Sequence, residues 1–478
     1  MASIVFGAGT SHTPMLNAAV EEWPLFEAID RRRALLHKDG RPATYDELVA
    51  VAPPSLQAEL APEKLNLRHA GAMAALGRLH EGLIGAELDA VIVIGDDHKE
   101  LYHDDNMPSI LVYRGETIAN VPNRTRTPAH IGAGPPDWMK RAVARYYEES
   151  ETRHYPVQAR LANHLIASLI DRDFDVASAT SLPEGEGEGH AFAFVHRRLM
   201  NGVAIPVVPV VLNTYYPPNQ PSPGRCYRLG QAIRAAIEGY AEGLRVGVVA
   251  SGGLSHFTVD EALDGALIRA LREKDARALQ SLPRQQLESG SSEIRNWICA
   301  AGALEHLDLD WLDYFPGYRT SAGTGTGLCF ARWGQGFCCS VGVRTVRRSF
   351  HVREKAGSRR AFAAVPGGDF EMGHRRGRRT RRAATGIGFR RGAIRHPRAD
   401  QCRNRAAPHS RDRAGEFGDC VARGGIRTPA RPCTRNGGLH LAKAGRHPSS
   451  SDDSCRRPDD RSCRKSRSLP KRDVFMTV

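Results

Sequence analysis

The chain has 478 residues, a length sufficient for two or three domains, and a formal net charge of +14. The charge is unevenly distributed: residues 335–478 carry 35 Lys and Arg against 12 Asp and Glu, whereas residues 1–334 carry 32 against 41. No apolar run approaches the roughly 20 residues that span a bilayer, and the N-terminal residues lack the basic and apolar regions of a signal peptide. These features argue against a membrane partner. The three widely spaced cysteines of residues 1–334, Cys226, Cys299 and Cys329, suit a reduced cytoplasmic protein rather than a disulfide framework.

Two apolar segments predict buried strands that each end at a histidine. Residues 4–6 are apolar and lead through a glycine-rich turn to His12, and the β-branched residues 91–94 lead through Gly-Asp-Asp to His98. Ligands of α/β proteins gather at the carboxyl ends of such strands. We therefore expect the two imidazoles to meet at one edge of the sheet.

The remaining predicted elements alternate between helix and strand. Between the first two strands we expect a helix over 25–38, a capped helical turn at 44–48 and a helix over 62–83. Prolines in the predicted strand 205–212 indicate an edge or a bulge, and the glycine-rich residues 320–327 indicate a tight turn that lines the pocket or closes the domain. The other expected strands are 109–113, 174–179 and one beginning at 245; the other expected helices are 136–149, 158–171, 225–242, 260–282 and 292–304. The alternation predicts a single α/β domain over residues 1–334, with a central, mostly buried sheet flanked by helices.

Residues 335–478 have a different composition. Ile, Leu, Val and Phe make up only 21 of these 144 residues, and Tyr and Trp are absent. This composition predicts a disordered tail, or the product of out-of-frame translation. The missing aromatic residues and the lack of a Cys-x-x-Cys pair argue against a nucleic-acid-binding module.

Four histidines follow a predicted strand or a glycine turn: His12, His98, His190 and His256. An acidic helix start at residues 260–264 comes soon after the last of them. Two imidazoles and one carboxylate form the facial triad of non-haem Fe(II) oxygenases, which leaves other coordination positions free for substrate and O₂. The spacing alone is also compatible with zinc-dependent hydrolysis or with no metal.

Five segments resemble, in the same order, those of class III extradiol ring-cleavage dioxygenases. They are residues 9–14, 95–98, 189–192, 225–234 and 251–256. The set is similar to the superfamily of the protocatechuate 4,5-dioxygenase β subunit, nearest its gallate and methylgallate branch, and covers residues 1–333. The resemblance implies cleavage of a catechol-type, protocatechuate-like or gallate-like ring by O₂ beside its two hydroxyl-bearing carbons.

The resemblance also implies roles for individual residues. His12 and His98 would be ligands of Fe(II), and the carboxylate ligand would lie at the acidic helix start. Glu261 is the expected carboxylate, with Asp260 and Asp264 as alternatives. His190 would be the acid/base residue. His164 corresponds to a histidine of the pocket, with a core helix histidine as the alternative reading.

Three functions remain open from the sequence. The first is an Fe(II)-dependent extradiol dioxygenase, which would act on a small aromatic diol and O₂. The second is a protein of the same fold that uses another metal, or none, for hydrolysis or binding. The third is a basic, nucleic-acid-associated protein. A homo-oligomer is compatible with each of them.

Overall fold

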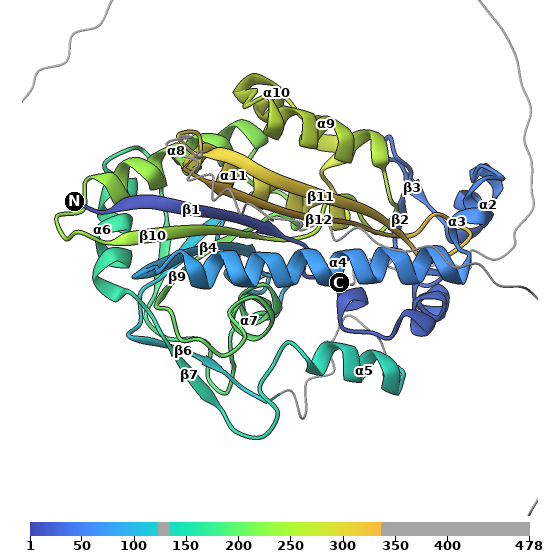
Figure 1. Ribbon diagram of the computed structural model, residues 1–478, viewed down its shortest axis with the longest axis horizontal. Helices are drawn as coiled ribbons and strands as arrows, with labels where there is room; N and C mark the ends of the chain where they lie inside the picture. Colours follow the sequence, from blue (N-terminus) through green and yellow to red (C-terminus); the bar gives the residue numbers. More distant parts are fainter. Residues whose placement is uncertain (123–133, 336–478) are drawn as a thin grey trace, which may run out of the picture. The chain divides into compact units, whose positions relative to one another are not determined.

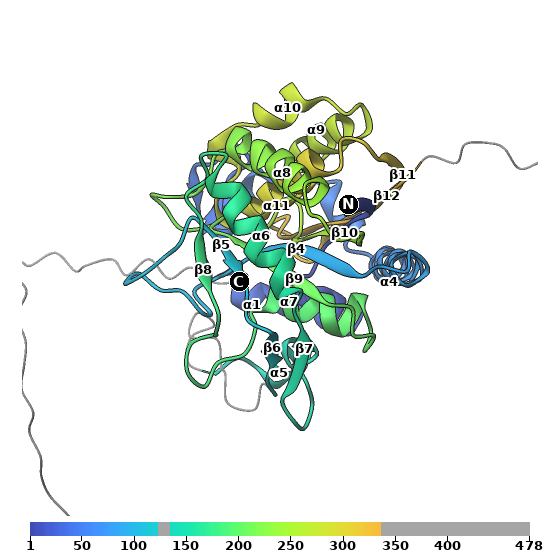
Figure 2. The same ribbon diagram turned by 90° about the vertical axis from the view of Figure 1, so that its left-hand side faces the viewer.

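A computed structural model describes residues 1–122 and 134–335 of the chain. An eight-stranded sheet runs through them in the order β11-β12-β1-β10-β4-β9-β5-β8 (Figures 1 and 2). Its strands are β1 (Ser3–Thr10), β4 (Ala90–Asp96), β5 (Ile110–Tyr113), β8 (Ala177–Ala179), β9 (Val207–Leu212), β10 (Arg245–Ser251), β11 (Asp308–Tyr318) and β12 (Gly325–Gly334). The prediction of an α/β fold around a central sheet is confirmed.

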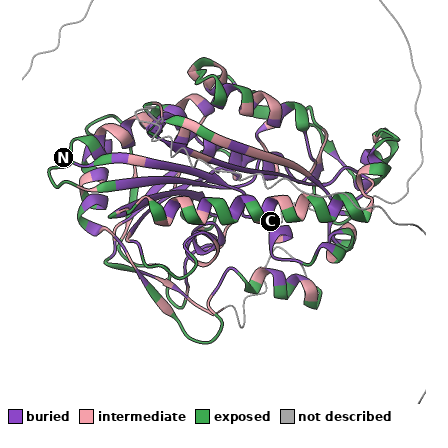
Figure 3. Cartoon of the chain, viewed as in Figure 1, coloured by how far each residue is buried: buried purple, intermediate pink, exposed green. Residues whose placement is uncertain are grey.

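The four central strands β1, β10, β4 and β9 are parallel to one another. Their residues alternate between two hydrophobic clusters, so that Ile92 and Ile94 belong to one and Val91 and Val93 to the other. Such strands are apolar on both faces because helices cover both faces of the sheet. Figure 3 shows this as continuous burial along the central strands. The apolar runs that predicted these strands are therefore explained by burial on two sides.

Helices pack on both faces of the sheet (Figure 2). One face is covered by α6 (Ala159–Ile170), α8 (Pro223–Glu238), α9 (Glu261–Arg272), α10 (Ala276–Gln280) and α11 (Ile294–Ala303). The other is covered by α4 (Pro62–Gly85), α5 (Asp137–Ala144) and α7 (His190–Phe194), which continues as a π-helix, η4 (Val195–Leu199). Among the described residues, no helix has both the length and the apolar character needed to cross a membrane.

Shorter elements form the region between β1 and α4. They are the 3-10 helices Pro14–Leu16 and Val20–Phe26, then α1 (Glu27–Asp30), β2 (Leu35–Leu36), β3 (Pro42–Ala43), α2 (Tyr45–Val51) and α3 (Leu56–Glu59). The capped turn is confirmed at α2: the Thr44 hydroxyl accepts a hydrogen bond from Glu47 N at 3.2 Å, while the Glu47 carboxylate accepts one from Thr44 N. The expected helix over 25–38 is shorter, because α1 ends at Asp30. A separate two-stranded antiparallel sheet pairs β6 (Thr117–Asn120) with β7 (Arg153–Pro156).

The sheet differs from the predicted one in two places. First, β9 is an interior strand and not an edge, because it pairs with both β4 and β5. Pro209 is tolerated there since pairing with β5 begins only at Val210, so this proline lies outside that ladder. Second, residues 308–334 form the β11–β12 hairpin, which extends the sheet beyond β1, with the glycine-rich residues 320–327 at its turn and in the start of β12.

Helix lengths also differ from prediction in the second half of the chain. The expected helix 260–282 is divided into α9 and α10, with Asp275 capping the second through Ala278 N at 2.9 Å. The expected helix 292–304 begins later, at Ile294, after a 3-10 turn over Ser289–Glu293. Glu293 is therefore the last residue before α11 and not a residue within it.

Candidate metal and catalytic site

The carboxyl ends of β1, β10 and β4 lie side by side, since these strands are neighbours in the sheet. His12 follows β1, His98 follows β4, and the turn that ends in His256 follows β10. All three side chains are buried. The expectation that His12 and His98 meet at one edge of the sheet is therefore supported by the topology.

Glu293 brings the two histidines together. Its Oε2 lies 3.2 Å from His12 Nε2, and its Oε1 lies 3.6 Å from His98 Nε2. The side chain is 2% exposed, and Gly253 N donates a hydrogen bond to its Oε2 at 2.6 Å. Two imidazoles and one carboxylate thus face a common space, with each donor supplied by a different segment of the chain.

The position of Glu293 depends on how closely α11 approaches the sheet. Trp297, one turn into this helix, lies against Gly9 of β1, where an added Cβ atom would come within 2.3 Å of the indole ring. The indole N–H donates to the Gly252 carbonyl at 2.9 Å. The absence of a side chain at Gly9 therefore lets the start of α11 reach the ends of β1 and β10.

Asp96 is a further acidic group of this site. Its Oδ2 lies 2.7 Å from His98 Nε2, and its Oδ1 accepts a hydrogen bond from Asn296 Nδ2 at 2.9 Å. Ligand atoms of Asp96, His98 and Glu293 lie within 4.8 Å of one another, as do those of His12, Asp96 and His190. Asp96 and Glu293 together give the buried histidines a negatively charged environment.

The donor set fits a divalent cation. Asp96 Oδ2 and both ring nitrogens of His98 are buried without a hydrogen bond of good geometry. Leaving such groups unsatisfied in the interior is costly, and a cation would satisfy the carboxylate and one imidazole nitrogen together. Among the described residues, two overlapping groups could hold a metal: His12, Asp96 and His190, and Asp96, His98 and Glu293. Glu293 lies beside both His12 and His98, so these three form a third possible set.

Charge interactions dominate the protonation of this site. Burial raises the pKa of Glu293, but His256 and His12 outweigh it and hold the pKa well below its usual range. His256 Nε2 lies 3.0 Å from Glu293 Oε1, and its Nδ1 lies 2.7 Å from the Leu254 carbonyl. For His98, burial lowers the pKa, but Asp96 more than offsets this and raises it. Glu293 is therefore an anion at neutral pH.

His190 lies at the same site, at the start of α7. Its Nε2 is 3.2 Å from His12 Nε2, and its Nδ1 is 3.1 Å from Glu100 Oε2. The backbone N–H of His190 also donates to Glu100 Oε2, at 2.7 Å. Burial lowers the pKa of His190, but Glu100 outweighs burial and raises it to about 10. Glu100 was missed in the sequence, although it lies only two residues after His98.

Aromatic and basic side chains surround the histidines. The Tyr146 hydroxyl donates to the His12 carbonyl, and the Tyr215 ring lies 4.9 Å from that of His98. Residues that line the adjoining pocket include Thr13, Pro14, Phe26, Arg33, Gly253, Phe257, Arg319 and Thr326, together with His12, His190, His256 and Glu293. From the glycine-rich residues 320–327, Thr326 at the start of β12 lines this pocket.

The acidic helix start lies outside these contacts. Glu261 is exposed and accepts a hydrogen bond from the Tyr318 hydroxyl at 2.6 Å. Asp260 caps α9 through Ala262 N at 3.1 Å, and Asp264 accepts from the Tyr314 hydroxyl at 2.7 Å. None of these three carboxylates contacts His12 or His98 among the described interactions, so Glu293 replaces Glu261 as the candidate ligand. In the sequence, Glu293 could have been recognised only as an acidic residue at the start of the apolar helix predicted over residues 292–304.

His164 also lies outside the cluster. It is part of α6, its Nε2 lies 2.9 Å from the Ala236 carbonyl of α8, and its ring packs on Tyr240 at 5.2 Å. The structure therefore places it between two helices, as the alternative reading expected, and not beside His190. The 335–478 tail, predicted to be disordered or out of frame, lies outside the described residues except for Gln335.

Comparisons with known proteins assign the chain to a family. The family model described as the catalytic LigB subunit of aromatic ring-opening dioxygenase matches residues 53–328, a range that includes His98, His190 and Glu293. The chain is also 38% identical over 100 residues to gallate dioxygenase of Pseudomonas putida, an overlap of 20% of this chain and 28% of that protein. The match thus spans well under half the length of this relative. The family match covers more than half of the chain, which therefore belongs to the LigB family of aromatic ring-opening dioxygenases.

Proposed function

We propose that the protein is an Fe(II)-dependent extradiol dioxygenase that opens the ring of a catechol-type acid, such as gallate or protocatechuate, with O₂. The observation that carries the proposal is the contact of Glu293 with both His12 and His98. Two imidazoles and one carboxylate are the protein ligands of many non-haem Fe(II) oxygenases. The name of the gallate dioxygenase relative supports the choice of substrate class.

Fe(II) is the metal that we assign to His12, His98 and Glu293. When bound, it supplies Lewis-acid chemistry, which favours ionisation of a substrate hydroxyl, and the redox chemistry that a reaction with O₂ requires. The surrounding residues bury this site, since His12 and His98 are each 3% exposed. Burial of the ligands excludes bulk water from the reaction.

His190 is the proposed acid/base residue. Its Nε2 faces the metal-binding histidines, while Glu100 holds Nδ1 and the backbone N–H of the same residue. The ring is thereby kept in one orientation, with Nε2 directed at the place where a substrate hydroxyl would lie. We propose that the neutral form of His190 takes a proton from that hydroxyl and returns it during ring opening. Because Glu100 raises the pKa of His190 to about 10, this form is a minor fraction of the free protein at neutral pH.

Arg33 is the proposed partner of the substrate's carboxylate. It lines the pocket together with His12 and His190, and its guanidinium lies 3.5 Å from the centre of the Phe257 ring. Burial lowers the pKa of Arg33 to about 10, so the group still carries its charge at neutral pH. Guanidinium groups bind carboxylates through two parallel hydrogen bonds, which fixes both position and orientation.

A neighbouring ion pair supports this assignment. Asp30 accepts two hydrogen bonds from Arg319, at 2.6 and 2.9 Å, and lies 3.6 Å from Arg33. One carboxylate therefore lies between two guanidinium groups at the pocket wall. The Phe26 and Phe257 rings beside them offer apolar surfaces for an aromatic ring.

Metal content and turnover of the protein purified without O₂ test the proposal. His12→Ala and His98→Ala should lose both bound iron and turnover, because each removes one of three protein ligands. His190→Phe should retain iron while turnover of gallate falls by roughly 10²–10⁴-fold, the usual contribution of an acid/base group. Stoichiometric iron in His12→Ala, or zinc in place of iron in the unaltered protein, would contradict the proposal.

The substrate class is tested by comparing gallate with pyrogallol, which lacks the carboxylate. Arg33→Met should lower kcat/KM for gallate by roughly tenfold to a hundredfold, because it removes one charge-assisted contact. The value of kcat/KM for pyrogallol should change much less. Arg41→Met is the control, since Arg41 is 73% exposed and pairs with Asp39. Equal losses for the two substrates would show that Arg33 does not read the carboxylate.

A further inference from the structure

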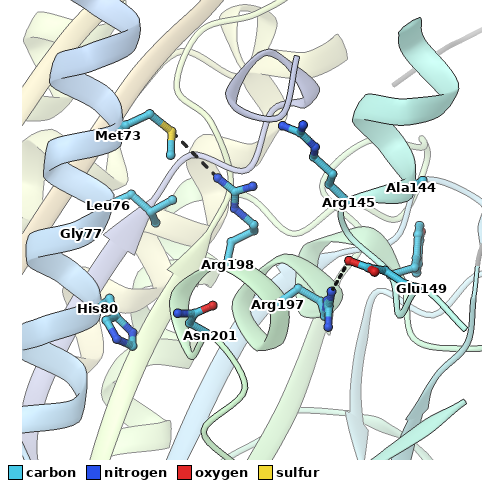
Figure 4. A pocket seen from close by; sticks show the side chains of 11 residues that line it. Met73, Leu76, Gly77, His80, Ala144, Arg145, Glu149, Arg197, Arg198 and Asn201 are labelled. Atoms are coloured by element: carbon cyan, nitrogen blue, oxygen red, sulfur yellow. Dashed lines mark hydrogen bonds and ion pairs between the residues drawn. The ribbon is translucent and has the colours of Figure 1, made fainter. Parts of the chain in front are cut away.

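A second cavity lies on the α4 side of the sheet and shares no lining residue with the pocket at the histidine cluster. It measures about 480 Å³ and lies between α4, residues 144–149 and the segment 197–201 (Figure 4). Its lining residues are Met73, Leu76, Gly77, His80, Ala144, Arg145, Tyr147, Glu149, Arg197, Arg198 and Asn201. Binding pockets for small molecules typically measure ~300–1,000 Å³, so the volume is sufficient for one.

Three arginines surround this cavity, and they differ in their partners. Arg197 forms ion pairs with Glu148 at 2.8 Å and Glu149 at 3.8 Å. Arg145 donates to a neutral group, the Asn17 carbonyl, at 2.7 Å, and Arg198 donates to another, the Met73 sulfur, at 3.9 Å. Among the described residues, no carboxylate lies within ion-pair distance of Arg145 or Arg198.

The two arginines that lack a carboxylate lie close to each other. In Figure 4 the Arg198 side chain extends toward Met73 of α4, and Arg145 comes from the separate segment that also carries Ala144. Burial, together with the charges of Arg145 and Arg197, lowers the pKa of Arg198. A partly buried cation facing a like charge is unfavourable by itself and becomes favourable when an anion lies between the two.

The geometry of the backbone helps to produce this arrangement. Arg197 and Arg198 belong to the π-helix η4, in which Met200 N donates to the Val195 carbonyl at 2.7 Å. Such wide turns are rare and are frequently found at functional sites. The opposite wall is apolar, formed by Met73 and Leu76 of α4.

We propose that this cavity binds a small organic carboxylate with an apolar body, of the size of a benzoate, whose carboxylate lies between Arg145 and Arg198. The apolar wall of α4 would contact the ring. This site differs from the one that we assign to the substrate, and the proposal does not rest on the proposed function.

The cavity is linked to the histidine cluster through the chain. Arg145 and Tyr147 line the cavity, while Tyr146 between them donates to the His12 carbonyl and packs its ring 6.1 Å from that of His190. Arg198 lies on the helical segment that begins at His190. A carboxylate held by Arg145 and Arg198 would therefore join the two segments that contact His12 and His190.

Titration of the full chain with 4-fluorobenzoate, followed by fluorine NMR, tests the proposal. Arg198→Gln and, separately, Arg145→Gln should weaken binding by roughly tenfold to a hundredfold, because each removes a charge-assisted contact. Arg141→Gln is the matched control: it lies on α5, is 66% exposed, pairs with Glu22 and does not line the cavity. Thermal unfolding of each variant shows whether it is folded. If Arg198→Gln does not fold, Arg145→Gln still tests the proposal, because Arg145 is exposed.

Three further measurements distinguish binding at this site from binding at the proposed substrate pocket and from unspecific binding of anions. Arg33→Met should leave this binding unchanged, and neutral 4-fluorobenzamide should bind at least tenfold more weakly. Equal affinity of Arg198→Gln and the unaltered chain would overturn the proposal. Loss of binding in Arg33→Met, equal binding of the benzamide, or displacement by an equal concentration of inorganic phosphate would overturn it as well.

Discussion

Glu293 is the residue on which the metal assignment depends most directly. Glu293→Gln should lose bound iron, because it replaces the anionic oxygen donor between His12 and His98 with a neutral amide. Glu261→Gln should keep its iron, since Glu261 is exposed and contacts Tyr318. Iron per protein chain, measured after anaerobic loading, distinguishes the two variants.

The iron content of the two variants decides between Glu293 and Glu261 as the ligand. Iron retained by Glu293→Gln and lost by Glu261→Gln would return the ligand to α9. Because Glu293 also accepts a hydrogen bond from Gly253 N, thermal unfolding of the variant must accompany the metal measurement.

Asp264 provides a second prediction at the scale of one residue, on stability and pH. Burial raises the pKa of this carboxyl to about 6 from 3.8, despite hydrogen bonds from Tyr314 and Ser255. The folded protein thus holds a proton that the unfolded chain releases between about pH 4 and pH 6. The group is most favourable to folding below that range, and this contribution declines as pH rises through it.

Asp264→Asn should remove this pH dependence. The free energy of unfolding of the unaltered protein minus that of the variant should decrease between pH 4 and pH 7, by about 3 kcal/mol at most. Urea unfolding at several pH values measures the difference. An increase with pH would show instead that the folded protein favours the ionised carboxylate.

At the scale of the element, the C-terminal end of α11 packs directly on α8. An added Cβ atom at Gly302 would lie 2.1 Å from the Tyr227 carbonyl oxygen, so that the two backbones touch. Gly302→Ala should lower the free energy of unfolding by about 1–3 kcal/mol, because the helices must separate. Gly77→Ala is the control: it lies within α4 with no atom within 4 Å of the added Cβ, and should raise stability by about 0.5–1 kcal/mol. Urea unfolding compares them, and a neutral Gly302→Ala would show that the helices can separate at no cost.

At the scale of the whole molecule, the sheet and the histidine cluster are built from residues up to Gly334, where β12 ends. We therefore predict that a chain ending at Gln335 keeps the thermal midpoint, iron content and turnover of the full chain. Residues 335–478 carry a strong excess of Lys and Arg, so any salt-dependent binding to DNA should be lost with them. Loss of iron or turnover on truncation would show that the catalytic unit needs these residues.

The sequence by itself determined the parts of the protein that depend on local pattern. Side chains alternate between the two faces of a strand, so an uninterrupted apolar run identifies a strand that is buried on both faces. The turn after each such strand places His12 and His98 at one edge of the sheet. The start of α2 was predictable because its capping box lies within four residues. The family resemblance also rests on short segments, three of them at the ends of β1, β4 and β10 and two in the helices α7 and α8.

Only the tertiary structure decided which distant groups complete the site. Glu293, Glu100 and Arg33 come from segments far apart in sequence, and their contacts depend on how helices and loops pack over the sheet. Glu261 and Glu293 both stand at the start of a helix that follows β10, so local pattern could not distinguish them. The close approach of α11 to β1, which requires Gly9, places Glu293 beside His12 and leaves Glu261 at the surface. The proposed choice of Glu293 over Glu261 thus depends on long-range packing, which no short sequence pattern encodes.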